Sequence, residues 1–371
     1  MKHILRNISL IIGSVTFALI ITEVLIRLFV PQELPTTRDD IWIPKDIVGV
    51  WKASNIDTMI NSGEGMVRFI TDAGGYRIGS APAPIDAPRL LLVGDSFIEA
   101  VGVEYEHSIS GLMELILTKR CEMPIHIVSA GVGGWNPNQY LSQTRMELEH
   151  SDYELVIVFI YVGNDIVNKR TGPVQPRRQS IPPFRMPKSF DHQELINATI
   201  YPLYKRLTYR SHLVVLIKSS INAFLMRTGF SRHHFPATLV RSNKNSELWD
   251  VTVSLSSDIA VIADSHNVPI MFVILPADYQ VDEQLGEAFA KGSSIDPSLV
   301  DLEQSNRILA QKLMKDNFQV IDTTTALRHA FQDGRKPYAD FDRHLSNSGH
   351  VVVVDKILPT TMELLQINSC N

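Results

Sequence analysis

The chain has 371 residues, of which 44% are hydrophobic and 20% are charged, a balance typical of a globular protein with a sizeable core. Its formal net charge of −5 gives no reason to expect a nucleic-acid partner. Two cysteines, Cys121 and Cys370, are too few for a framework of disulfides, and we expect no structural role from either. Composition therefore argues against a basic nucleic-acid binder and against a small domain stabilised by disulfides.

The N-terminus combines a basic start with a long apolar run. Lys2 and Arg6 precede residues 8–30, which are long enough to span a bilayer as one helix. Glu23 and Arg27 stand four residues apart, so they share one helical face near the outer end of this run and can pair there.

A cleaved signal peptide is the alternative, with residues 8–22 as its apolar region. No small-x-small cleavage site follows that region, which favours a retained anchor. Lys2 and Arg6 place the N-terminus in the cytoplasm by the positive-inside rule. We therefore expect a single-pass membrane protein whose chain after Pro31 lies in the periplasm or outside the cell.

Residues 31–88 are expected to form a linker and N-terminal extension. The proline-rich stretch 81–88 is typical of an extended linker. Residues 67–77 predict a strand and a turn that pack on the main domain. The pattern alone assigns no task to this segment.

From residue 89 onward, strands alternate with helices, which predicts an α/β fold with a parallel sheet. Strands are expected at 90–93, 125–129, 155–162, 268–275 and 318–321. Helices are expected at 108–120, 136–150, 249–266, 299–315 and 348–365, the last interrupted by Pro359. The main domain is therefore assigned to residues 89–371.

An insertion at about 166–248 breaks this alternation. It begins with basic and proline-rich sequence and continues with a predicted helix at 201–226. Because it follows the carboxyl end of a strand, it is well placed to form a lid or a substrate wall. The alternative is a solvated excursion that tolerates charge.

The pair His233 and His234 has no further metal-ligand spacing around it, so we expect neither a metal nor a cofactor.

Polar and small residues gather where the predicted strands end. Gly94-Asp95-Ser96, the stretch 131–134 and Gly163-Asn164-Asp165 each follow a strand, and Asp342-Arg-His344 precedes the closing helix. In an open α/β sheet the carboxyl ends of the strands form the ligand-binding edge. Taken alone, Asp95 and Ser96 could simply cap the next helix.

Together, these residues have a use in acyl transfer. A serine hydroxyl needs a neighbouring histidine to take its proton, and a carboxylate can orient that histidine. A glycine N–H and an asparagine amide can hold the developing oxyanion. An α/β-hydrolase elbow would need Gly at position 98, where Ile stands, and a dinucleotide fingerprint would need Gly at 136, where Asn stands.

Gly94-Asp-Ser-Phe97, Ala130-Gly-Val-Gly-Gly134, Gly163-Asn-Asp165 and Asp342-Arg-His344 resemble the blocks of the SGNH/GDSL hydrolases, in the same order. The resemblance covers residues 89–365. It implies a flavodoxin-like three-layer α/β/α fold and a serine esterase or acyltransferase.

Carried over by position, the resemblance makes Ser96 the nucleophile and a backbone donor to the oxyanion hole. Gly134 would supply a second N–H, Asn164 the side-chain donor and His344 the base. The acid of the usual pattern would stand at position 341, which is Phe. Asp342 stands two residues before the histidine instead, a spacing that resembles that of the polysaccharide O-acetyltransferase-like members. The expected order of an anchor followed by an external domain also resembles those members.

The sequence thus predicts a membrane-anchored enzyme of the cell envelope with a Ser96–His344–Asp342 mechanism. Its substrate is expected to be an acyl ester, with an envelope polysaccharide as one candidate. Water as acceptor would make it an esterase, and a sugar hydroxyl would make it an O-acyltransferase. The alternative is an inactive glycan-binding or scaffold protein on the same fold.

Overall fold

The computed structural model describes residues 2–30, 32, 38, 40–61, 65–81, 87–120, 122, 124–171, 196–208, 210–228, 236–241, 247–292, 295–340 and 342–366. Several residues discussed above lie outside this range: both cysteines, the histidine pair at 233–234, Phe341, and residues 82–86 of the proline-rich stretch 81–88.

A five-stranded parallel sheet organises the main domain. Its strands are β6 (Arg89–Gly94), β7 (His126–Gly131), β8 (Leu155–Tyr161), β9 (Ile270–Leu275) and β10 (Gln319–Asp322). They lie in the order β7-β6-β8-β9-β10, and every pairing is parallel. Numbered along the chain, this is the 2-1-3-4-5 order of the flavodoxin-like folds. The predicted fold class is therefore confirmed.

The apolar runs form strands because the sheet is covered on both faces. Leu91 and Val93 of β6 point into one core, and Leu90 and Leu92 point into the other. All four side chains are fully buried. Such continuous apolar strands are typical of a parallel sheet between two helical layers.

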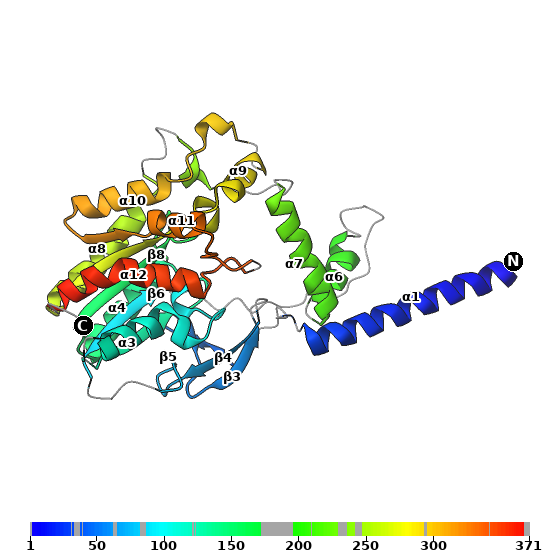
Figure 1. Ribbon diagram of the computed structural model, residues 1–371, viewed down its shortest axis with the longest axis horizontal. Coiled ribbons are helices and arrows are strands. Elements are labelled where there is room, and N and C mark those ends of the chain that lie inside the picture. Colours follow the sequence, from blue (N-terminus) through cyan, green and yellow to red (C-terminus); the bar gives the residue numbers. More distant parts are fainter. Residues whose placement is uncertain are drawn as a thin grey trace.

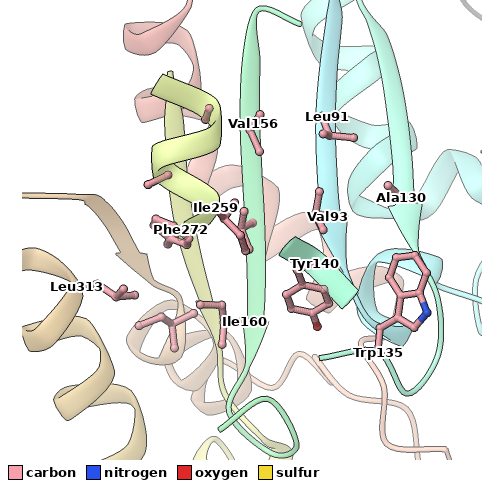
Figure 2. Close-up of a cluster of buried hydrophobic side chains, with 14 of the residues drawn as sticks. Leu91, Val93, Ala130, Trp135, Tyr140, Val156, Ile160, Ile259, Phe272 and Leu313 are labelled. Carbon is pink, nitrogen blue, oxygen red and sulfur yellow. The ribbon is translucent and has the colours of Figure 1, made fainter. Parts of the chain in front are cut away.

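Helices cover both faces of the sheet (Figure 1). On the first face lie α4 (Pro137–His150), α8 (Asp250–Ser265) and α10 (Gln304–Lys315). On the second face lie α3 (Ile109–Arg120), α11 (Thr324–Gln332) and α12 (Asn347–Leu364). Figure 2 shows the first core, where Ile259 of α8 and Leu313 of α10 face strand residues such as Phe272. The three predicted layers are thus present.

The closing helix α12 continues through Pro359, so the predicted interruption was wrong. A proline in a helix loses one hydrogen bond, here to the carbonyl of Asp355. Both Pro359 and Asp355 are exposed, so water can satisfy that carbonyl. The opposite face of the helix keeps Val353 and Ile357 buried.

The N-terminal extension contains two small antiparallel sheets. The hairpin consists of β1 (Trp42–Lys45) and β2 (Gly49–Lys52), and the second sheet of β3 (Asp57–Asn61), β4 (Met66–Thr71) and β5 (Arg77–Ile78). The strand and turn predicted at 67–77 are therefore present. Helix α1 (Lys2–Phe29) precedes these sheets and projects away from the main domain (Figure 1).

In the described part of the insertion, two α-helices stand where the sequence predicted a single helix at 201–226. α6 (Tyr201–Thr208) and α7 (His212–Arg227) are separate helices. Ser211 accounts for the break, because its side chain accepts the N–H of Val214 and so starts the second helix. α7 contacts both α1 and α9 (Glu283–Gly292), and it lies between them in Figure 1.

Candidate active site

Ser96 stands at the carboxyl edge of β6, at the start of the short helix α2 (Ser96–Glu99). The side chain of Asp95 caps this helix by accepting the N–H of Phe97 at 3.0 Å. Of the two residues that the sequence offered as helix caps, Asp95 is the one that caps α2. The Ser96 hydroxyl is therefore available for another partner.

His344 is that partner. Its Nε2 lies 2.7 Å from Oγ of Ser96, although the two residues are 248 positions apart in the chain. A tight loop presents the ring: the N–H of Ala339 donates to the carbonyl of His344 at 2.8 Å, and the N–H of Ser346 donates to the carbonyl of Pro337 at 3.0 Å. This is the hydrogen-bond geometry of a nucleophile and its general base.

Arg343 fixes the same loop from the other side. Its backbone is left-handed, with φ of 64°. Its guanidinium pairs with both carboxylate oxygens of the nearly buried Asp278, which follows β9. The pair raises the pKa of Arg343 despite the opposing effect of burial. The loop is therefore anchored to the sheet beside the histidine.

Asp342 contacts His344 in two ways. Its Oδ1 accepts the backbone N–H of His344 at 2.9 Å, and its Oδ2 lies 3.7 Å from Nδ1 of the ring. The second distance is that of an ion pair rather than of a hydrogen bond. Burial lowers the pKa of His344, but the carboxylates of Asp342 and Asp95 outweigh burial and raise it above 6.5.

Asn164 lies beside the serine. Its Nδ2 donates to Oδ2 of Asp95 at 3.2 Å. The turn that carries it is held by Asp165, which is fully buried and accepts the N–H of Tyr161 at 2.9 Å and the hydroxyl of Tyr140 at 2.7 Å. Burial raises the pKa of Asp165 well above its ordinary value.

The glycines after β7 form the opposite side of the site. A Cβ added to Gly133 would lie 3.8 Å from Cβ of Ser96, so this loop runs directly past Ser96. Gly134 has φ of 80°, a conformation that favours glycine. Among the described residues, no protein atom accepts its backbone N–H. That N–H is thus available to a ligand.

Asp95 is a site residue whose role the sequence did not suggest beyond capping. Its carboxylate is 1% exposed and receives the Phe97 N–H on one oxygen and the Asn164 amide on the other. Burial raises its pKa to about 6, against the lowering effect of these donors and of His344. Asp95 therefore links the turn that carries Ser96 to Asn164.

An open cleft of about 460 Å³ reaches these residues. It is lined by Ser96, Phe97, Tyr161, Gly163, Asn164, Pro236, Tyr279, Phe289, Asp342, Arg343 and His344. The ring of Phe97 lies 4.3 Å from that of Tyr161 and 5.0 Å from that of His344, centroid to centroid. The cleft thus offers an aromatic wall next to a polar centre.

His350, the other histidine of this region, is separate from the site. It is 2% exposed, and its Nδ1 accepts the N–H of Ile109 at 3.2 Å. Burial lowers its pKa to about 3, so the ring is neutral and structural. Among the described residues, no group of three or more His, Cys, Asp or Glu side chains could hold a metal ion.

No family model matches the sequence, and no curated protein matches it. Solved structures with which it aligns include a member of the lipolytic G-D-S-L family from Veillonella parvula, with 10% identity, coverage of 74% of this chain and 97% of that chain, and a TM-score of 0.38. The acetyl xylan esterase AlAXEase aligns with 13% identity over 73% and 98% of the two chains, with a TM-score of 0.41. A variant of Axe2, an acetyl xylan esterase from Geobacillus stearothermophilus, aligns with 13% identity over 79% and 99%, with a TM-score of 0.39.

Proposed function

We propose that the protein is a serine esterase that hydrolyses acyl esters. The observation that carries this proposal is the 2.7 Å contact between Ser96 Oγ and His344 Nε2 at the edge of the sheet where ligands bind. The loop before Gly134, whose N–H has no acceptor among the described residues, passes Ser96, and Asn164 lines the same cleft as the serine.

The residues of the site share the steps of the reaction. Ser96 attacks the ester carbonyl while His344 takes its proton, and the carbonyl electrons move to the oxygen. The backbone N–H groups of Ser96 and Gly134 and the amide of Asn164 stabilise that oxyanion. His344 then gives the proton to the leaving alcohol, which leaves an acyl group on Ser96. A water molecule, deprotonated by His344, releases the acid and restores the serine.

Water is the acceptor we favour because the centre is open to solvent. The His344 side chain is 34% exposed, whereas a transferase needs to keep water from its acyl-enzyme. The aromatic wall of Phe97 and Tyr161 fits the apolar part of an acyl group. We propose that an envelope glycan supplies the alcohol portion of the ester substrate. Transfer of the acyl group to a sugar hydroxyl instead of water is one outcome of the test.

The test compares the detergent-solubilised full chain with its Ser96→Ala variant on p-nitrophenyl acetate. We expect the variant to lose at least about 10³-fold in kcat, because the nucleophile is absent. Ser110→Ala is the matched control, since Ser110 is buried in α3 and its hydroxyl makes no hydrogen bond among the described residues. A fluorophosphonate probe should label the wild type at Ser96.

Equal activity of wild type and Ser96→Ala, without labelling of the serine, would contradict the proposal and favour the binding or scaffold protein. Addition of an oligosaccharide acceptor separates the two enzymes: acylated sugar detected by mass spectrometry, formed at the expense of free acid, would make the protein an O-acyltransferase.

We further propose that α1 is a retained membrane anchor with the catalytic domain outside the cytoplasm. The helix contains an apolar stretch, Arg6–Phe29, that is long enough to cross a membrane, a property shared by signal sequences. Retention is supported by Glu23, whose carboxylate accepts the N–H groups of His212 and Leu213 at 3.0 Å and the Ser211 hydroxyl at 2.8 Å. Cleavage would remove this cap from α7.

Mass spectrometry of the protein from washed membranes tests the anchor. We expect an N-terminal peptide that includes residues before Glu23. A mature chain that begins after residue 30, released into the soluble fraction, would contradict retention and identify a signal peptide.

A further inference from the structure

The N-terminal hairpin contacts the loop 131–135, which lies beside Ser96. Nζ of Lys52, a buried side chain of β2, donates to the carbonyl of Gly131 at 2.6 Å. The neighbouring Trp51 stacks on Trp135 at the other end of the loop, with centroids 5.6 Å apart and planes at 27°. Both ends of the loop are therefore held by residues from outside the main domain.

Glu99 holds the middle of the loop. This residue of α2 is 2% exposed and follows Ser96 by three positions. Its Oε1 accepts the indole N–H of Trp42 at 2.6 Å, and its Oε2 accepts the backbone N–H of Gly133 at 2.7 Å. Both partners can only donate, and each faces a different oxygen of Glu99, so both oxygens must be acceptors in this arrangement. A carboxylate supplies two, whereas an amide of the same shape supplies one.

The same hairpin and β5 surround this carboxylate with positive charge. Arg77 is 1% exposed and donates to the carbonyls of Glu99, at 2.9 Å, and of Val103, at 2.5 Å. Burial lowers the pKa of Lys52 to about 8 and that of Arg77 to about 10, and the charge of Glu99 opposes both shifts. The buried carboxylate is thus compensated rather than isolated.

The loop needs such support because it carries an oxyanion donor. Gly134 follows Gly133 directly, and two consecutive glycines leave the backbone many conformations. A donor acts on a transition state only when it is aimed within a few tenths of an ångström. The hydrogen bond to the Gly133 N–H fixes the Val132–Gly133 peptide plane, which adjoins the plane that carries the Gly134 N–H.

We propose that Glu99, held by Trp42, is a positioning residue that aims the Gly134 N–H at the oxyanion. Neither residue lines the cleft, so they act through the loop and not on the substrate. This role rests on the proposed function for its effect on turnover, but the placement of the loop is measurable without it. The N-terminal extension is then a working part of the site.

Two variants test the proposal in the full chain. Glu99→Gln removes one acceptor, and Trp42→Phe removes the indole donor but keeps a ring. We expect each variant to lower kcat about 10- to 100-fold while KM changes by less than about twofold. This loss in kcat is somewhat smaller than the loss caused by removal of a whole oxyanion donor. The pH midpoint of kcat/KM should stay in place, because neither variant touches His344.

Trp249→Phe is the matched control. Trp249 is fully buried in the first core, and its indole N–H makes no hydrogen bond among the described residues. It should lose thermal stability like the other two variants and keep its kcat. A general loss of packing would lower all three activities together, which would overturn the proposal.

Hydrogen–deuterium exchange of the peptide that contains residues 131–135 gives a readout besides activity. We expect faster exchange in Glu99→Gln and Trp42→Phe and unchanged exchange in Trp249→Phe. Unchanged exchange in the first two variants, with kcat near that of the wild type, would overturn the proposal. A wild type without Ser96-dependent turnover would instead refute the esterase, and the exchange would still decide whether Glu99 positions the loop.

Discussion

Replacement of Asp342 by Asn removes a negative charge 3.7 Å from Nδ1 of His344 and preserves the shape of the side chain. At that distance two unit charges interact by about 1 kcal/mol in water and by about 4 kcal/mol at an effective dielectric constant of 20. Because the His344 side chain is 34% exposed, the lower half of this range applies, roughly 1 to 2.5 kcal/mol. The imidazolium should lose that stabilisation.

The assay is kcat/KM for p-nitrophenyl acetate from acid to alkaline pH. Only neutral His344 can accept the proton, and its pKa is raised, so the wild-type activity should rise with pH around a midpoint above 6.5. Asp342→Asn lowers the pKa of His344, so the midpoint should move to lower pH by about 1 to 2 units. The plateau should fall about 5- to 70-fold, because the imidazolium forms in the transition state.

Asp340→Asn is the control, since Asp340 is exposed and its carboxylate lies 3.3 Å from Nζ of Lys336. It should leave both the plateau and the midpoint unchanged. If Asp342→Asn also retained the wild-type plateau and midpoint, Asp342 would not be the carboxylate that supports the base. The reasoning from the 3.7 Å contact would then be refuted, and Asp95 would become the residue to test.

Asn164→Ala should lower kcat by about 10²- to 10³-fold with little change in KM, because the amide is a donor in the proposed oxyanion hole. A comparable rise in KM with kcat unchanged would instead make Asn164 a ground-state binding residue. Gly131→Ala should lower the free energy of unfolding by about 1 to 3 kcal/mol, because the added Cβ would lie 2.6 Å from the Glu99 backbone nitrogen and 2.8 Å from the Asp95 carbonyl oxygen. Urea denaturation measures this change, and an unchanged midpoint would show that α2 can shift away from β7.

The sequence was sufficient to predict the sheet and to bring Ser96 and His344 together at its edge. Four consecutive apolar residues at 90–93 predict a strand buried on both faces, and such strands occur in parallel sheets. The parallel arrangement brings the strand ends to one edge, where Ser96 and Asn164 lie. His344 was found through its motif, and the structure places it 2.7 Å from the serine.

The remaining parts depend on contacts that no local pattern contains. Glu99 is an ordinary polar residue of a helix until the hairpin brings Trp42 against it from 57 positions away. Asp95 acquires its perturbed pKa from burial, which the sequence does not reveal. The sequence did not predict α9 (Glu283–Gly292), because this helix is short. It wrongly predicted a break at Pro359, because proline is tolerated on an exposed helical face.

Helix α7 also limits where a substrate can be. Its first residues are capped by Glu23 of α1, and the helix contacts α9, whose Phe289 lines the cleft. Its 16 residues span about 24 Å at 1.5 Å per residue. With α1 in the bilayer, as proposed, the helix is a spacer of fixed length, and Ser96 can lie only a few nanometres above the lipid surface. The enzyme would then act on esters held close to the membrane and would not reach those in outer layers of the envelope.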